Sequence, residues 1–273
     1  MAGRTSVPIA QLAVAIIFSI PTLFIFIRHG GPGLLGWFYL FAFCTLLIIG
    51  AALQINAENK GTSTSSSSLI SNIGLSPLLL ATSGVLHEAR NYRNPTPRKC
   101  CEWTLVGVVH LLVATGIALV ACGASALYDG TANTGQLNLV KVGVILLLIT
   151  YVLVAAWAFY SMLPTQSRKD AAGHHDGSLL LYGVILSLPF TGIRVLYSVV
   201  ALLSESPKLN PATGVLGLTV GLNLVPQLIS ILIFIVAGWV TLGIRRSGGM
   251  VVDDRRRTHS SRSRRSRRAR TSV

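Results

Sequence analysis

The sequence predicts an all-α, polytopic membrane protein with seven transmembrane helices. Composition supplies the first two observations: 51% of the 273 residues are hydrophobic and only 12% are charged, whereas soluble domains carry about 25% charged residues. The third observation is the recurrence of apolar runs that reach the roughly 17 to 25 residues needed to cross a bilayer. A soluble amphipathic helix would interrupt such runs with a regular polar face, and the long runs lack one.

Seven runs have this length, and each is expected to be a helix because a segment in lipid must satisfy its own backbone hydrogen bonds. The third run is the weakest, since Ser, Asn, Gly and Pro residues dilute it between positions 71 and 77. Pro21, Pro77, Pro189 and Pro226 lie inside runs and predict kinks. The predicted spans are residues 9–27, 34–55, 69–86, 104–127, 137–163, 179–203 and 215–244, which form one bundle domain over residues 1–244.

The distribution of Lys and Arg among the loops predicts an outside N-terminus and a cytoplasmic C-terminus. The three loops on the side of the C-terminus carry seven Lys or Arg residues, whereas the opposite loops carry only Lys60 and Lys208, with Arg4 near the N-terminus. No cleaved signal peptide is expected, because Arg28 follows the first run directly and no small-residue cleavage site follows it. The pattern does not distinguish the endoplasmic reticulum from the plasma membrane.

The segment from residue 245 to 273 is a polybasic tail. It holds eleven Arg residues against Asp253 and Asp254, and its stretch RRRTHSSRSRRSRRAR has almost no apolar residue, so we expect it to be disordered. A tail held at a membrane gains roughly 1 kcal/mol per basic residue from anionic lipids. Membrane lipids are therefore its expected partners and nucleic acid is not; a topology anchor with no other role is the alternative.

Motifs of soluble enzymes are missing from the sequence. It has no Gly-rich phosphate loop, no CxxC pair and no HExxH, so neither a cofactor nor a metal is predicted. The triplet His174-His175-Asp176 resembles a set of metal ligands, but it falls in a short loop where adjacent histidines are usually solvated. Cys100 and Cys101 adjoin the fourth span and are candidates for palmitoylation, or they are free thiols.

Four ionisable residues are candidates for catalysis. His87 and Glu88 are expected to end the third span, and His110 lies about two turns into the fourth span from the same side. These residues either form an acid–base pair or are helix-end polar groups that face lipid headgroups. Asp129, at the outer end of the fourth span, is the remaining candidate.

Arg194 lies within the apolar run Leu179–Leu203, which contains no carboxylate. Ionisable groups at this depth are costly and usually face the bundle interior. Arg194 is expected to bond to backbone carbonyls and Gln227, to reach a carboxylate at the outer rim, or to bind the anionic head of a ligand. Five polar residues from four predicted helices share the outer half of the bilayer and are the candidate ligand-binding set: Arg194, Lys141, Gln54, Asn223 and Gln227.

Two segments resemble a fungal family of seven-helix membrane proteins of unassigned function. They are "FIRHGGPGLLGWFYLFAF", with Arg28-His29-Gly30 before Gly36-Trp37, and "PFTGIRVLYSVV", which contains Arg194. The resemblance covers about residues 8 to 244. It implies that Arg194 follows a family pattern. It also implies an arginine near Leu47 and a carboxylate in the seventh span, where this sequence has Gln227.

Four classes of function remain open. The leading hypothesis is a protein that binds or converts a lipophilic small molecule, by analogy with small fungal membrane-bound cyclases of terpenes and meroterpenoids in secondary metabolism. Such a cyclase protonates an alkene or epoxide of a prenylated substrate and needs an acid, and the acids nearest to spans are Glu88, Glu102 and Asp129. The alternatives are a receptor-like protein, a transporter, and an accessory membrane protein without catalysis.

The orientation generates the first prediction. A glycosylation acceptor engineered into residues 62–68 is expected to be modified in microsomes, and one placed in residues 250–273 is expected to remain unmodified. The shift of each product on a gel, with and without glycosidase, measures this. Modification of the tail instead of the 62–68 segment would reverse the predicted topology.

Overall fold

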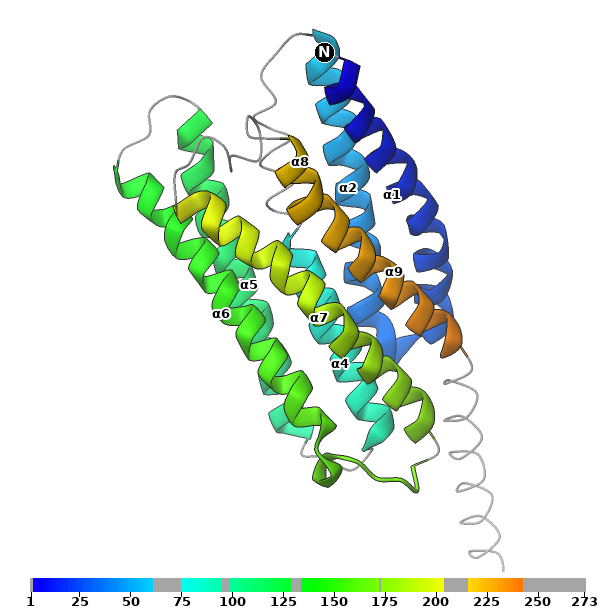
Figure 1. Cartoon of the computed structure of the whole chain (residues 1–273). Coiled ribbons are helices and arrows are strands. Elements are labelled where there is room, and N and C mark those ends of the chain that lie inside the picture. Colours follow the sequence, from blue (N-terminus) through cyan, green and yellow to red (C-terminus); the bar gives the residue numbers. More distant parts are fainter. Residues whose placement is uncertain are drawn as a thin grey trace, which may run out of the picture.

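The protein is a bundle of long helices in a computed structural model that describes residues 2–60, 75–94, 99–128, 134–171, 173–203 and 216–242 (Figure 1). The chain leaves the last helix at residue 240, and the polybasic tail lies outside the described residues. The long helices are α1 (Ala2–His29), α2 (Leu34–Lys60), α4 (Leu75–Arg93), α5 (Lys99–Tyr128), α6 (Thr134–Met162), α7 (His174–Leu203) and α9 (Val225–Val240).

The predicted all-α, multi-pass membrane fold is confirmed. No strand occurs in the described part of the chain, and six of its helices are long and apolar enough to cross a membrane. They are α1, α2, α5, α6, α7 and the last helix, which runs through Val220–Val240. Their outward faces carry large exposed hydrophobic side chains such as Ile17, Leu111 and Val240, as lipid contact requires.

The third predicted span, residues 69–86, overlaps the described helix α4 only in part. Helix α4 begins at Leu75 and ends at Arg93, so it starts six residues later and ends seven residues later than the apolar run over residues 69–86. Its second half is polar, and α4 falls short of a membrane-spanning composition. It nevertheless has almost every residue from Ser76 to Ala89 buried, because α2, α5, α6 and α7 all pack against it. Neighbouring helices, instead of lipid, surround α4.

The helices pack as two tight hairpins around this central helix. Helices α1 and α2 form one hairpin and α5 and α6 form the other, while α7 and α9 complete the bundle (Figure 1). In the last span, the short helix α8 (Leu216–Thr219) leads into a π-helical turn over Val220–Leu224, immediately before Pro226. A proline lacks the N–H for a regular helical bond, and a π-turn is a local way to accommodate such a break. The sequence predicted a kink at this proline.

Glycine pairs allow the closest helix crossings. A Cβ atom added to Gly84 of α4 would lie 2.4 Å from the backbone nitrogen of Gly36 in α2. A Cβ atom on Gly143 of α6 would lie 2.7 Å from the carbonyl oxygen of Gly116 in α5. Small residues let helix backbones approach in this way within membranes. The α2–α4 crossing matters most here, since Gly36 precedes Trp37 and Gly84 lies one turn before Glu88.

The crossing generates a stability prediction. Gly84→Ala is expected to destabilise the protein by about 1 to 3 kcal/mol, because the added methyl group forces α2 and α4 apart. Thermal unfolding in detergent measures the loss. Gly107→Ala is the matched control: it is also a glycine in a helix, but an added Cβ there has nothing within 4 Å, so its melting temperature should stay the same or rise slightly. Equal melting temperatures for the two variants would contradict the close crossing.

Candidate functional site

A fully buried acid–base pair joins α1 to α4. The His29 Nδ1 atom lies 2.8 Å from Oε1 of Glu88, and both side chains are 0% exposed. The other carboxylate oxygen of Glu88 accepts a hydrogen bond from the Trp37 indole nitrogen at 2.8 Å. The second ring nitrogen of His29 lies 3.0 Å from the carbonyl oxygen of Gly238. Three helices, α1, α2 and α4, therefore meet at one carboxylate, and His29 links α9 to it.

Three glycines make room for this cluster. Helix α1 ends at His29, and the chain turns through Gly30, whose φ of 66° favours glycine. The short turn Gly31–Gly33 then leads into α2. A Cβ on Gly33 would lie 2.8 and 2.9 Å from the two oxygens of Glu88, and one on Gly238 would lie 2.3 Å from the Trp37 ring. The Gly-rich turn thus brings the end of α1 and the start of α2 against the carboxylate.

The hydrogen bonds fix how many protons the pair holds. The carbonyl of Gly238 is an acceptor, so Nε2 of His29 must carry a proton. One further proton must lie between Nδ1 of His29 and Oε1 of Glu88, because two bare acceptors would repel at 2.8 Å. The pair is therefore either imidazolium with carboxylate or imidazole with carboxylic acid, and its total charge is zero in both forms. It stores one exchangeable proton without placing net charge in the bundle.

This geometry corrects the interpretation of Glu88 as a helix-end group. Glu88 lies inside α4, is fully buried and points towards α1 and α2, so it does not face lipid headgroups. Its acid–base partner is His29, which the sequence reasoning missed, although the quoted segment around Arg28-His29-Gly30 contained it. A histidine two residues beyond an apolar run, followed by a glycine turn and Trp37, was the available signal.

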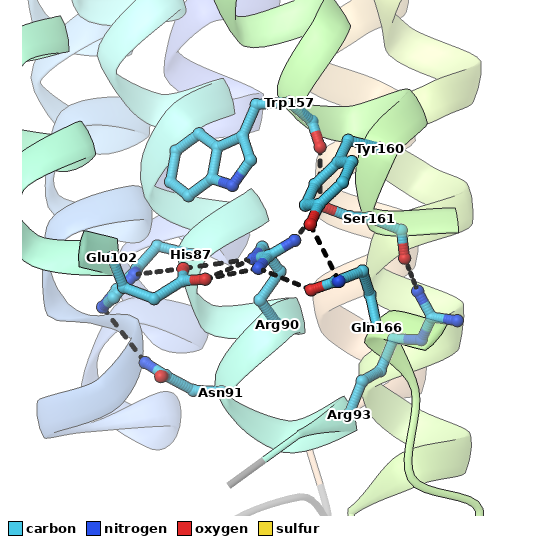
Figure 2. Close-up of polar contacts among 9 residues, drawn as sticks. All are labelled: His87, Arg90, Asn91, Arg93, Glu102, Trp157, Tyr160, Ser161 and Gln166. Carbon is cyan, nitrogen blue, oxygen red and sulfur yellow. Dashed lines mark hydrogen bonds and ion pairs between the residues drawn. The ribbon is translucent and has the colours of Figure 1, made fainter. Parts of the chain in front are cut away.

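A second polar cluster occupies the other side of α4 (Figure 2). Arg90 donates from Nε to both oxygens of Glu102, at 2.9 and 3.1 Å, and its Nη2 atom also binds Glu102. The Nη1 atom of Arg90 donates to the Ser161 hydroxyl at 2.6 Å, and Nη2 lies 3.4 Å from Gln166. Trp157 and Tyr160 flank the guanidinium. This cluster ties α4 to α5 and to the end of α6.

The two other histidine candidates lie apart from Glu88. His87 is 3% exposed; its Nε2 atom lies 3.1 Å from the Asn91 amide, and its Nδ1 atom is 3.9 Å from Glu102. His87 is therefore buried against α5 and does not face headgroups either. His110 donates from Nδ1 to the carbonyl of Val106, one turn back in α5. The expected pairing among His87, Glu88 and His110 is not formed.

Only some of the five candidate ligand-binding residues lie on helices that pack against one another. Arg194 is 1% exposed and donates from Nη1 to the Ser198 hydroxyl, one turn further along α7. Asn223 and Gln227 are buried on the π-turn and α9, which pack against α7. Gln54 donates to Glu58 within α2 at 3.3 Å. Lys141 is half-buried on α6, which packs on α5 and α7, whereas α2 packs mainly on α1 and α4.

The structure also places the histidines of the possible metal-binding triplet, whereas three other candidate side chains lie outside the described residues. His174 lies 2.6 Å from the Ser167 hydroxyl and His175 is exposed. Among the residues that the structure describes, no three His, Cys, Asp or Glu side chains gather as a metal site would require. Asp129 lies outside the described residues, and so do the side chains of Cys100 and Cys101.

Comparisons with known proteins return one family. The model of a family described as a domain of unknown function (DUF7702) matches residues 1–243, which is the helix bundle without the polybasic tail. No curated protein and no solved structure matches the chain. The resemblance to an uncharacterised family is thereby confirmed, and the comparison carries no information on a fungal source or a cyclase activity.

The Glu88 cluster generates a stability prediction with its own control. In Glu88→Gln, the amide oxygen still accepts from Trp37 and the amide nitrogen donates to Nδ1 of neutral His29, so all three hydrogen bonds persist and the stability should change by less than about 1 kcal/mol. Glu88→Leu leaves two buried polar groups without a partner, each costing about 1 to 3 kcal/mol. Thermal unfolding in detergent should therefore separate the two variants. A Glu88→Gln protein as unstable as Glu88→Leu would show that the carboxylate charge itself holds the helices.

Proposed function

We propose that this chain, which belongs to the DUF7702 family, binds and converts a lipophilic small molecule by acid–base chemistry at Glu88 and His29. The best-supported specific reaction is a cyclisation of a prenylated substrate, as in a membrane-bound terpene or meroterpenoid cyclase. The observation that carries the proposal is the fully buried contact between a carboxyl group and an imidazole inside a membrane bundle, which we infer to hold one exchangeable proton.

Separation of the two partners need not place charge in the bundle. A carboxylic acid and a neutral imidazole carry no charge, whereas a carboxylate and an imidazolium would be two charged groups in an apolar environment. A carboxylic acid without competing water is a suitable donor to an alkene or an epoxide. The Trp37 indole binds the other oxygen, which keeps the proton on the oxygen that faces His29.

Helix α1 supplies a route from the lipid to this acid. Only 17% of the residues in the apolar window of α1 are buried, against 56% in α7. In the proposed reaction, an outward displacement of the end of α1 withdraws His29 from Glu88. A molecule dissolved in the bilayer then reaches the carboxyl group laterally, without passing through water.

In the proposed reaction, Glu88 and His29 together supply and recover the one proton that is transferred. Glu88 gives its proton to the substrate, and ring closure forms a carbocation. Neutral His29 takes the proton that the cation loses when the product double bond forms. The imidazolium then returns this proton to the Glu88 carboxylate. Substrate and product are isomers of equal mass, and no cofactor enters.

A long ligand fits the separation of the polar residues. Ala89, next to Glu88, packs against Gly177 of α7. Arg194 lies about 17 residues further along α7, or roughly 25 Å at the rise of an α-helix. A molecule with a polar head near Arg194, Asn223 and Gln227 would need an extended apolar chain to approach Glu88. A prenylated aromatic compound has this shape.

The competing function is an accessory membrane protein without a ligand. It is favoured by the complete hydrogen bonding of the Glu88 carboxylate, which is what a purely structural cluster requires. Receptor and transporter roles have no comparable observation in the described residues. The Glu88→Gln variant separates the two functions, since it keeps the hydrogen bonds and removes the exchangeable proton.

The experiment compares lipid-soluble extracts of native cells that lack the protein and are complemented with variants. We expect the wild type to restore a metabolite that is missing from the deletion strain. Glu88→Gln should instead accumulate an isomer of equal mass and different retention time, detected by liquid chromatography and mass spectrometry. Asp176→Asn, an equivalent change in a half-buried carboxylate of α7, should behave as the wild type. Full complementation by Glu88→Gln would refute the acid–base role and leave the accessory function.

A further inference from the structure

Arg93 is a buried arginine at the end of α4. Its side chain is 9% exposed, and its Nη1 atom donates to the backbone carbonyl of Ser161 at the end of α6. Its aliphatic part packs against Gly177, where an added Cβ would lie 3.1 Å from Cγ of Arg93. Its own carbonyl accepts a hydrogen bond from the backbone N–H of Arg168 at 3.0 Å. Two segments thus hold the side chain, and a third holds the backbone of the same residue.

One edge of this guanidinium has no acceptor among the described residues. The Nε atom of Arg93 is buried without a hydrogen bond, and Figure 2 shows the second terminal nitrogen directed away from Ser161 and Gln166. The Nε and Nη2 atoms together form the side-on fork that binds a carboxylate or phosphate with two parallel hydrogen bonds. Arg90, one turn earlier, shows this fork in use, since its Nε and Nη2 atoms both bind Glu102.

The charges around Arg93 call for an anion from outside the described chain. The nearest described carboxylate that faces α4 from α5 is Glu102, which Arg90 already holds. The loop that crosses below Arg93 adds the exposed cations Arg168 and Lys169 and one exposed carboxylate, Asp170, while Asp176 lies in the first turn of α7 next to Gly177. No hydrogen bond joins either carboxylate to Arg93, and Tyr182 of α7 lies close enough to interact electrostatically. Leaving a buried cation without a counter-ion is costly, so a bound anion at this edge would stabilise the bundle.

We infer that Arg93 is the centre of a phosphate-binding site at the end of the bundle where α4 and α6 end and α7 begins (Figure 1). Arg93 ends a helix whose neighbours cross the bilayer, so the fork lies at the depth where lipid phosphates gather. In the predicted orientation this is the cytoplasmic side, which is rich in anionic lipids. The Arg93 fork would hold two phosphate oxygens, and Arg168 and Lys169 would neutralise the remaining charge. This site is separate from Glu88 and does not depend on the proposed reaction.

Thermal unfolding of the full-length protein in detergent tests the site. We expect phosphatidic acid to raise the melting temperature of the wild type, and phosphatidylcholine to have a smaller effect. In Arg93→Gln, the half-saturating concentration of phosphatidic acid should rise roughly tenfold, because two charge-assisted hydrogen bonds are lost. Arg28→Gln is the matched control: Arg28 is an exposed arginine beside the Phe24 ring at the end of α1, and its loss should leave the response unchanged. The polybasic tail is present in every variant, so any lipid binding by the tail contributes equally to all of the melting temperatures that are compared.

Inorganic phosphate distinguishes the source of the group. A shift with phosphatidic acid alone supports a lipid headgroup, and an equal shift with inorganic phosphate supports a soluble phosphate-bearing molecule at the same fork. If Arg93→Gln does not fold, Arg93→Lys carries the test, since it keeps the charge but lacks the fork and should bind more weakly than the wild type. The absence of any shift in the wild type, or an equal response in the Arg93 variant that folds, would overturn the site.

Discussion

The hydrogen-bonded carboxylate of Glu88 is the interaction on which the arrangement of this bundle depends. In lipid, apolar side chains attract one another no more than they attract acyl chains, so helix contacts are set by close packing and by polar groups that have no other partner. Glu88 binds His29 and Trp37, and His29 binds Gly238. One side chain on α4 thereby joins the end of α1 to the start of α2, and its partner His29 joins both to α9.

Helix α4 combines these roles because each of its sides faces a different partner. Glu88 points to the α1–α2 hairpin, and Arg90 points to the α5–α6 hairpin through Glu102 and Ser161. Arg93 reaches the end of α6 and the start of α7. Gly84 allows the approach that makes the first of these contacts short. The low hydropathy of α4 is therefore consistent with its deep burial, because its polar side chains contact neighbouring helices and are exposed neither to lipid nor to water.

The sequence predicts the membrane class, because lipid exposure demands long apolar runs, and six described helices have this character. Helix α4 extends beyond the predicted run over residues 69–86, since a helix that is shielded by other helices need not be apolar, and that run stops where the polar contacts begin. Glu88 could be named as a candidate, but its partner His29 lies 59 residues earlier. Only the packing of α1 and α2 on α4 brings them together. The expected depth of Gln54 in the bilayer also could not predict its partner. Its side chain donates to Glu58 of the same helix and not to Arg194.

The composition of α4 has a consequence for how the chain enters the membrane. Translocon scales assign Arg about 2.5 to 3.5 kcal/mol against insertion at a helix centre and less near the ends. Helix α4 carries Arg90 and Arg93 in its last turn and Glu88 before them, so it partitions poorly as a single segment. Helix α5 follows after a short connection and brings Glu102, which neutralises Arg90. Biogenesis is therefore expected to insert α4 and α5 as one helical hairpin, with α4 held back until α5 has left the ribosome.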